Sequence, residues 1–109
     1  MKIENIDKFL QEIIRVPLLS KEEELALVKV VQEKGQDCDE MEQLRQSNMR
    51  FVVALAVQYQ NRGLTLEELI SIGVEGLEKA AMSYDLDSDI DFKKHAVALM
   101  RQCLEEAVS

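Results

Sequence analysis

Residues 44–59 read LRQSNMRFVVALAVQY, and this stretch decides the fold. Its apolar side chains follow a helical stripe made of Leu44, Met49, Val52, Val53, Ala56 and Tyr59. Phe51, Leu55 and Val57 widen that stripe until it covers most of the helix surface. A helix that is apolar on most sides is buried on most sides. We therefore expect a long central helix from about Met41 to Asn61.

Two further helices are expected before the central one. Pro17 lacks the backbone donor that a helix interior needs, so it ends a first amphipathic helix from about Ile6 to Val16. Ser20 and Glu23 have the spacing of a capping box, which predicts the start of a second helix. Gly35 is the expected end of that helix, because glycine adopts the backbone conformation of a C-terminal cap.

Two more helices are expected after the central one. Thr65 and Glu68 form a second capping box, which predicts a helix that continues to about Ser83. Asp91 is a candidate N-cap for a last helix over Phe92–Val108. The sequence therefore predicts an all-α protein, folded as a compact five-helix bundle.

The length and charge of the chain limit what it does. It has 109 residues and a mass of 12.5 kDa, which suits one domain. We expect a single domain over 1–109, with helices in about 1–35 preceding a core in 41–108. The 21 acidic and 13 basic side chains give a net charge of −8. A generally basic nucleic-acid-binding protein is therefore disfavoured.

No feature of a secreted or membrane protein is evident. The first ten residues, MKIENIDKFL, lack the apolar core of a signal peptide. No uncharged apolar run approaches the roughly 20 residues that cross a bilayer. The two cysteines, Cys38 and Cys103, suit a reduced compartment better than a disulfide framework. We expect a cytoplasmic protein with no membrane partner.

No set of residues suited to catalysis is evident either. His95 is the only histidine, and Cys103 lies about two helical turns beyond it, too far for direct contact along one helix. The acidic run Asp85–Asp91 resembles the start of a calcium loop but lacks its glycine and its closing glutamate. Gly73 and Gly76 form no phosphate-binding motif and are expected to permit close helix approach. The sequence predicts a non-enzymatic protein without cofactor, metal or small-molecule substrate.

Several strings of the sequence follow one another in a familiar order. SNMRFVVALA at 47–56 and YQNRGL at 59–64, which LEELISIGVEGLEKA at 66–80 continues without a gap, resemble the start of region 2 of bacterial RNA polymerase sigma factors of the sigma-70 family. Upstream, FLQEI at 9–13 and VPLLSKEEE at 16–24 resemble the helical segment before region 2, region 1.2. The resemblance spans about 7–108 and implies the family's all-helical fold.

A polymerase-binding helix is the first implication of this resemblance. In sigma factors, the helix that matches 68–78 docks on a coiled coil of the largest subunit of core RNA polymerase. The matching positions are Glu68, Leu69, Ser71, Ile72, Val74, Glu75 and Glu78. Acidic residues beside apolar ones suit a partner helix that carries basic side chains. The alternative is that Ile72 and Val74 belong to the core while Glu75 and Glu78 are merely solvated.

A nucleic-acid-binding surface is the second implication. Asn48, Phe51 and Arg62 match positions that approach the non-template strand, although a helix polar face or the core accounts for them equally well. The full set of matching or nearby positions is Asn48, Phe51, Arg62, Phe92, Lys93, Lys94, His95, Arg101 and Gln102.

This surface is also where the sequence departs from the family. The family's last region 2 helix carries Tyr-Ala-Thr-Trp-Trp, whose aromatic rings stack on unpaired bases, but residues 95–99 read HAVAL. Such stacking is worth about 1–3 kcal/mol per base. From Tyr84 onward, six acidic residues stand against three basic ones, the opposite of a surface that tracks phosphates. We expect weak promoter DNA binding and a degraded promoter-melting surface.

Two functional hypotheses follow from the resemblance. The first is a transcription initiation module that binds core RNA polymerase and promoter DNA, with its melting surface degraded. The alternative is a stand-alone sigma-like module or regulator that docks on polymerase without opening DNA. A segment of a longer sigma factor and a reduced sigma-like unit are both compatible with a sequence that ends at Ser109.

Overall fold

The computed structural model describes residues 6–109, so residues 1–5 of the expected segment 1–35 lie outside the described residues. Its helices are α1 (Ile6–Ile13), α2 (Lys21–Lys34), α3 (Asp39–Ala56), the short 3-10 helix η1 (Val57–Tyr59), α4 (Leu66–Ser83) and α5 (Phe92–Val108). No strand occurs within this part of the chain. The prediction of a compact all-α protein with five main helices is confirmed.

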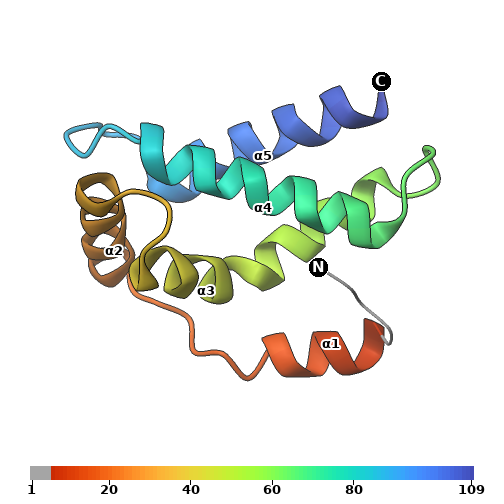
Figure 1. The fold of residues 1–109 in the computed structure, drawn as a ribbon, viewed down its shortest axis with the longest axis horizontal. Helices are drawn as coiled ribbons and strands as arrows, with labels where there is room; N and C mark the ends of the chain where they lie inside the picture. Colours follow the sequence, from red (N-terminus) through yellow and green to blue (C-terminus); the bar gives the residue numbers. More distant parts are fainter. Residues whose placement is uncertain (1–5) are drawn as a thin grey trace.

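The helices are arranged around α3, which crosses the middle of the molecule (Figure 1). α4 and α5 run antiparallel and side by side, while α2 lies at one end and α1 at the lower edge of the view (Figure 1). The core draws its buried apolar side chains from every α helix, and the fully enclosed ones include Val28, Val31, Met41, Leu44, Val52, Leu69, Ile70, Leu77 and Leu104. The five helices therefore share one core.

The two predicted capping boxes are both present. The Ser20 hydroxyl accepts from the Glu23 backbone N–H at 3.1 Å, and the Glu23 carboxylate accepts from the Ser20 N–H at 3.0 Å. Thr65 and Glu68 make the same reciprocal pair at the start of α4. Each box satisfies two backbone donors that a helix start leaves without partners.

Other helix ends differ from the predictions. The α-helical part of the central helix ends at Ala56, and the chain tightens into η1 instead of continuing to Asn61. The first helix ends at Ile13, before the expected Val16. Asp91 precedes α5 as predicted, but its side chain makes no capping hydrogen bond and pairs with Lys21 instead, at 3.3 Å.

The burial of the central helix differs from the prediction at Phe51 and Val57. The stripe from Leu44 to Tyr59 is buried as predicted, and so is Leu55. Phe51 and Val57, however, are 37% and 41% exposed. The α3–η1 segment therefore leaves part of its apolar surface open.

The helical glycines permit close helix approach, as the sequence indicated. A Cβ on Gly76 would lie 2.6 Å from the Met100 Cα, so the α4 backbone lies almost against that of α5. A Cβ on Gly73 would lie 2.8 Å from a methyl group of Val52 on α3. Both glycines therefore remove a side chain where α4 is packed most tightly.

α2 is joined to α4 by a side chain as well as by the core. The Gln32 amide donates to the carbonyl oxygens of Ala81 and Tyr84, at 3.0 and 2.7 Å. These carbonyls belong to the C-terminal end of α4, where the helix itself supplies no donors. Gln32 thus supplies hydrogen-bond donors to the end of a helix whose carbonyl groups lie 49 and 52 residues away in sequence.

Candidate interaction surfaces

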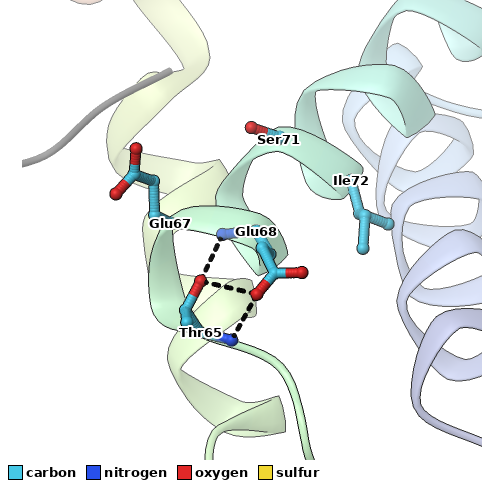
Figure 2. Close-up of a pocket in the computed structure, with 5 residues that line it drawn as sticks. All are labelled: Thr65, Glu67, Glu68, Ser71 and Ile72. Carbon is cyan, nitrogen blue, oxygen red and sulfur yellow. Dashed lines mark hydrogen bonds between the residues drawn. The ribbon is translucent and has the colours of Figure 1, made fainter.

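The first surface is an open hollow at the N-terminal end of α4. Its lining residues are Thr65, Glu67, Glu68, Ser71 and Ile72. Figure 2 shows Ile72 directed toward α5, whereas the Glu67 side chain points to the opposite side of the helix. Three of the predicted polymerase-binding residues, Glu68, Ser71 and Ile72, therefore lie together on this face.

Glu68 has a structural role on this face. One carboxylate oxygen accepts from the Thr65 backbone N–H at 3.2 Å and from the Thr65 hydroxyl at 3.0 Å (Figure 2). The side chain nevertheless remains on the exposed surface of the molecule. Helix capping therefore fixes the position of the negative charge that Glu68 presents.

A second hollow continues the face along the seam between α4 and α5. Its lining residues are Ile72, Glu75, Lys79, Cys103, Glu106 and Ala107. Ile72 lines both hollows, so it lies between them at the centre of the combined face. Glu75 is exposed, while Ile72 itself is half-buried. We call the surface formed by Glu68, Ser71, Ile72 and Glu75 the α4 face.

Leu69, Val74 and Glu78 do not belong to the α4 face. Leu69 is fully buried, which corrects its prediction as a contact residue, because its side chain is enclosed by the core. Val74 is half-buried and packs against the same core. The Glu78 carboxylate lies 2.5 Å from the Arg45 guanidinium and joins α4 to α3. The core alternative therefore fits Val74, whereas Glu78 is ion-paired with Arg45 instead of merely solvated.

Arg45 is the centre of the ion pairs that join α3 and α4. Its Nε donates to Glu78 at 2.8 Å, and its Nη1 donates to Glu42 at 2.9 Å. Partial burial acts to lower the pKa of Arg45, but the hydrogen bonds that Arg45 donates to Glu78 and Glu42 outweigh it and raise that pKa. Because the pair is only about a fifth exposed, it fixes the orientation of α4 on α3.

The second surface gathers three of the predicted nucleic-acid-binding residues, Asn48, Phe51 and Lys93. The Lys93 ammonium lies 5.5 Å from the centre of the Phe51 ring and donates to the Asn48 side-chain carbonyl. Asn48 is buried, as its core alternative expects, and its assignment to a DNA strand stays a prediction. We call these three residues together with Glu24 the Lys93 cluster.

Glu24 was missed by the sequence analysis. Its carboxylate accepts from Lys93 at 2.8 Å and from the Asn48 amide at 3.2 Å, and the residue is buried. Glu24, Val28 and Val31 are spaced four and three residues apart, and all three are buried on the same side of α2. The sequence could have indicated that Glu24 is buried, because this acidic residue occupies a position of the apolar stripe of its helix.

The other predicted nucleic-acid-binding residues are spread over α5 and its surroundings. Phe92 is buried against Tyr84, with the ring centres 5.4 Å apart, so it serves the core rather than a stacking surface. His95 Nε2 lies 2.9 Å from the Ser83 hydroxyl. Arg101 donates to Gln58 at 3.1 Å, Gln102 donates to Glu106 at 3.4 Å, and Arg62 and Lys94 are exposed.

Neither a metal-binding cluster nor a membrane-spanning helix occurs among residues 6–109. No group of three or more His, Cys, Asp or Glu side chains suited to a metal ion occurs among residues 6–109. Cys38 and Cys103 are both free thiols. Within the same part of the chain, every helix is too short or too polar to cross a membrane.

Comparison with known proteins identifies the family. Residues 5–37 match the family model for region 1.2 of the sigma-70 factor, and residues 44–108 match the model for sigma-70 region 2. The region 2 match alone covers more than half of the chain. The chain therefore belongs to the sigma-70 family, as the resemblance in the sequence indicated.

Individual relatives agree with the family match. RNA polymerase sigma factor SigA of Listeria monocytogenes is 37% identical to this chain over 101 residues. The sigma factor SigA of Clostridium acetobutylicum is 36% identical over the same length. In both cases the alignment covers 93% of this chain and 26% of the relative. The chain thus spans about a quarter of the length of the curated relatives it matches.

Proposed function

We propose that this chain is a sigma-70 transcription initiation module that docks on core RNA polymerase through the α4 face. The observation that carries the proposal is the arrangement of that face: Ile72 lies between two hollows, and the exposed carboxylates of Glu68 and Glu75 flank it. The match to sigma-70 region 2 over 44–108 supports the choice of polymerase as partner.

The α4 face suits a helical partner with basic side chains. An apolar residue in a hollow supplies an anchor from which water is excluded, and anchors of this kind carry most of the energy of an interface. The surrounding carboxylates select a positively charged partner and accelerate its approach. The coiled coil of the largest polymerase subunit is the partner that the family implies, and we assign the α4 face to it.

The promoter-melting function is proposed to be degraded. His95 is hydrogen-bonded to Ser83, and residues 95–99 carry no aromatic ring beyond its imidazole. Glu105 and Glu106 are exposed on the same helix as Lys94 and Arg101. The carboxylates of Glu105 and Glu106 carry the same negative charge as the phosphates of DNA and repel them. We therefore propose that promoter DNA binds weakly.

The second candidate function is a regulator that occupies polymerase without opening DNA. The observation that favours it is the contrast between the α4 face and α5. The α4 face keeps acidic and apolar residues at accessible positions, whereas α5 has lost the stacking residues that strand opening requires. Both candidates share the polymerase contact and a non-enzymatic role, and both place the protein in the cytoplasm.

The polymerase contact is tested by titrating the coiled-coil fragment of core polymerase with the purified protein. The double variant Ile72→Ala/Glu75→Lys is expected to bind at least about tenfold more weakly, because it removes the apolar anchor and reverses one charge. Glu75 is preferred to Glu68, whose loss would also remove a helix cap. Glu33→Lys on α2 makes the same charge change away from the face and is expected to leave the affinity nearly unchanged. Failure of the parent protein to bind the fragment would reject the proposal.

The two candidates are separated by titrating a single-stranded promoter oligonucleotide. A triple variant, His95→Tyr/Ala98→Trp/Leu99→Trp, restores stacking residues and is expected to strengthen binding, because each stacked base is worth about 1–3 kcal/mol. Weak but measurable binding by the parent protein would favour the initiation module, and tight binding would reject the proposal that its DNA surface is degraded. Binding that appears only in the triple variant would favour the regulator.

A further inference from the structure

The second hollow belongs to α5 as much as to α4. Its lining is divided equally between the two helices: Ile72, Glu75 and Lys79 come from α4, and Cys103, Glu106 and Ala107 come from α5. The hollow has a volume of about 270 Å³, whereas pockets for small molecules measure roughly 300–1,000 Å³. It therefore suits one long side chain of a protein partner, and it continues the α4 face onto α5.

Two carboxylates in this hollow have no cationic partner within the protein. Among residues 6–109, neither Glu75 nor Glu106 forms an ion pair, and both residues are exposed. The Glu106 carboxylate accepts a hydrogen bond from the neutral amide of Gln102, at 3.4 Å. In the same part of the chain, the Lys79 ammonium lies 4.0 Å from the Cys103 sulfur and makes no ion pair. Two unpaired negative charges therefore share the hollow with one positive charge.

Glu106 and its neighbour Glu105 have different surroundings. The Glu105 carboxylate accepts a hydrogen bond from the Tyr59 hydroxyl at 3.4 Å, toward η1, whereas Glu106 lines the seam with α4. Both lie in the last turn of α5, where the negative end of the helix dipole disfavours an acidic residue. The helix dipole therefore gives α5 no stability from the charge of Glu106, and that charge remains available to a partner.

We propose that Glu106 is a docking residue of α5: together with Glu75 it receives a basic side chain from the partner helix that docks on the α4 face. A guanidinium or an ammonium placed between two carboxylates makes charge-assisted hydrogen bonds to both of them. Ile72, which points toward α5 in Figure 2, offers apolar surface to the stem of such a side chain. The inference rests on the proposed function for the identity of the partner, core RNA polymerase.

Lys79 limits the hollow to one basic side chain. With Glu75, Glu106 and Lys79 counted, the charge of the lining is 1 − 2 = −1. A partner that brings one cation neutralises this charge, whereas a second cation is repelled by the Lys79 ammonium. Charges arranged in this way fix the register of a docked helix as well as attract it.

Glu106→Gln is the variant that tests this role, because it preserves the shape of the side chain and removes its charge. Glu105→Gln is the matched control, since it makes the same change one residue earlier, outside the lining of the hollow. Its amide oxygen can still accept from the Tyr59 hydroxyl. The helix dipole does not favour an acid at either position, so both variants are expected to be as stable as the parent. Urea denaturation followed by circular dichroism verifies this.

The first measurement is the affinity for the coiled-coil fragment of core polymerase at two salt concentrations. At low salt, Glu106→Gln is expected to bind about threefold more weakly than Glu105→Gln, the order of one exposed charge pair, and Glu106→Lys about tenfold more weakly. Both losses are expected to shrink at about 0.5 M salt, because ions screen exposed charges. Parent affinity in Glu106→Lys, together with weak binding by Ile72→Ala/Glu75→Lys, would overturn the role of Glu106 and leave the α4 face in place.

The second measurement requires no polymerase, because the half-buried Cys103 thiol lines the hollow and reports its charge. A cationic and an anionic methanethiosulfonate reagent of similar size are compared by mass spectrometry, with Cys38 in the same sample as the internal reference. Removal of one nearby negative charge changes the two rates about twofold in opposite directions at low salt. The ratio of cationic to anionic labelling is therefore expected to fall about fourfold in Glu106→Gln and less than about twofold in Glu105→Gln.

The two measurements separate this inference from the proposed function. An unchanged labelling ratio in Glu106→Gln would overturn the inference, whatever the polymerase titration shows. A parent protein that does not bind the coiled-coil fragment would reject the proposed function. A labelling ratio that falls as expected in such a protein would retain the cation-receiving hollow and reject polymerase as its partner.

Discussion

Replacement of Gly76 by alanine places a methyl group where α4 and α5 are closest. The new Cβ would lie 2.6 Å from the Met100 Cα, 3.0 Å from the Met100 nitrogen and 3.1 Å from the Leu99 carbonyl oxygen. All three neighbours are backbone atoms, so no rotation of a side chain relieves the contact. Carbon atoms pack at about 3.5–4.0 Å, and the two helices must therefore separate by roughly 1 Å.

The free energy of unfolding is expected to fall by about 2 kcal/mol in Gly76→Ala. Alanine favours the helix by about 1 kcal/mol relative to glycine, which acts in the stabilising direction. Overpacking of a tight core costs about 1–3 kcal/mol, and a gap of this size forfeits a quarter to a half of each dispersion contact along the seam. The seam includes Leu77, Ala80, Ala96, Met100 and Leu104, all buried, so we expect the loss to exceed the gain.

Urea denaturation followed by circular dichroism measures this change, with Gly73→Ala as the matched control. The control adds the same methyl group to the same helix, but its Cβ would meet a terminal methyl group of Val52 at 2.8 Å instead of backbone. We expect Gly73→Ala to be closer to neutral than Gly76→Ala, because a side chain adjusts more easily than a helix. A Gly76→Ala protein as stable as the parent would refute the close approach of the two backbones.

Three other predictions follow from burial and capping. Leu55→Ala is expected to lower the free energy of unfolding by about 2–5 kcal/mol in a urea titration, because Leu55 is 5% exposed; a negligible loss would contradict its place in the core. Amide exchange is expected to be faster in α1 than in α5, because among the described residues α1 has one buried residue, Ile13, whereas α5 has four buried residues. Equal protection of the two helices would contradict this prediction. The hydrogen bonds from Ser20 lower the pKa of Glu23, so the stabilisation of α2 by the Glu23 carboxylate is fully present above the ordinary pKa of 4.5 and is lost as the pH falls through the lower folded pKa. Amide chemical shifts at the start of α2 report this loss of the helix cap, and Glu23→Gln is expected to remove their pH dependence.

The parts of the fold that depend on nearby residues were predictable from the sequence. A capping box joins residues three apart, so Ser20 with Glu23 and Thr65 with Glu68 could be recognised without knowledge of the fold. The bounds of the last helix, Phe92–Val108, were also correct. Asp91 shows the limit of this reasoning, because its side chain pairs with Lys21, 70 residues away, instead of capping α5.

The candidate site was predictable as a helix but not as a surface. The resemblance to the family placed Glu68 and Leu69 together, yet one side chain is exposed and the other is fully buried. The apolar spacing of Leu69, Ile70, Leu77 and Ala80 indicates the side of α4 that meets the core, but the residues of α3 and α5 that pack there are known only from the fold. Glu24 illustrates the same limit, because an acidic residue in an apolar stripe shows its partners only when α3 and α5 are folded against α2.

The contact that Gln32 makes with the end of α4 shows that the two family-matched regions are not structurally separate. The two family matches, 5–37 and 44–108, suggest two exchangeable pieces. Gln32 belongs to the first piece and supplies the donors for two carbonyl groups of the second, while Val28 and Val31 fill the common interior. Loss of Gln32 would leave both carbonyl groups without that donor, and loss of Val28 and Val31 would open the interior. The boundary between the two matches therefore divides the sequence but not the core, which residues from both matches fill.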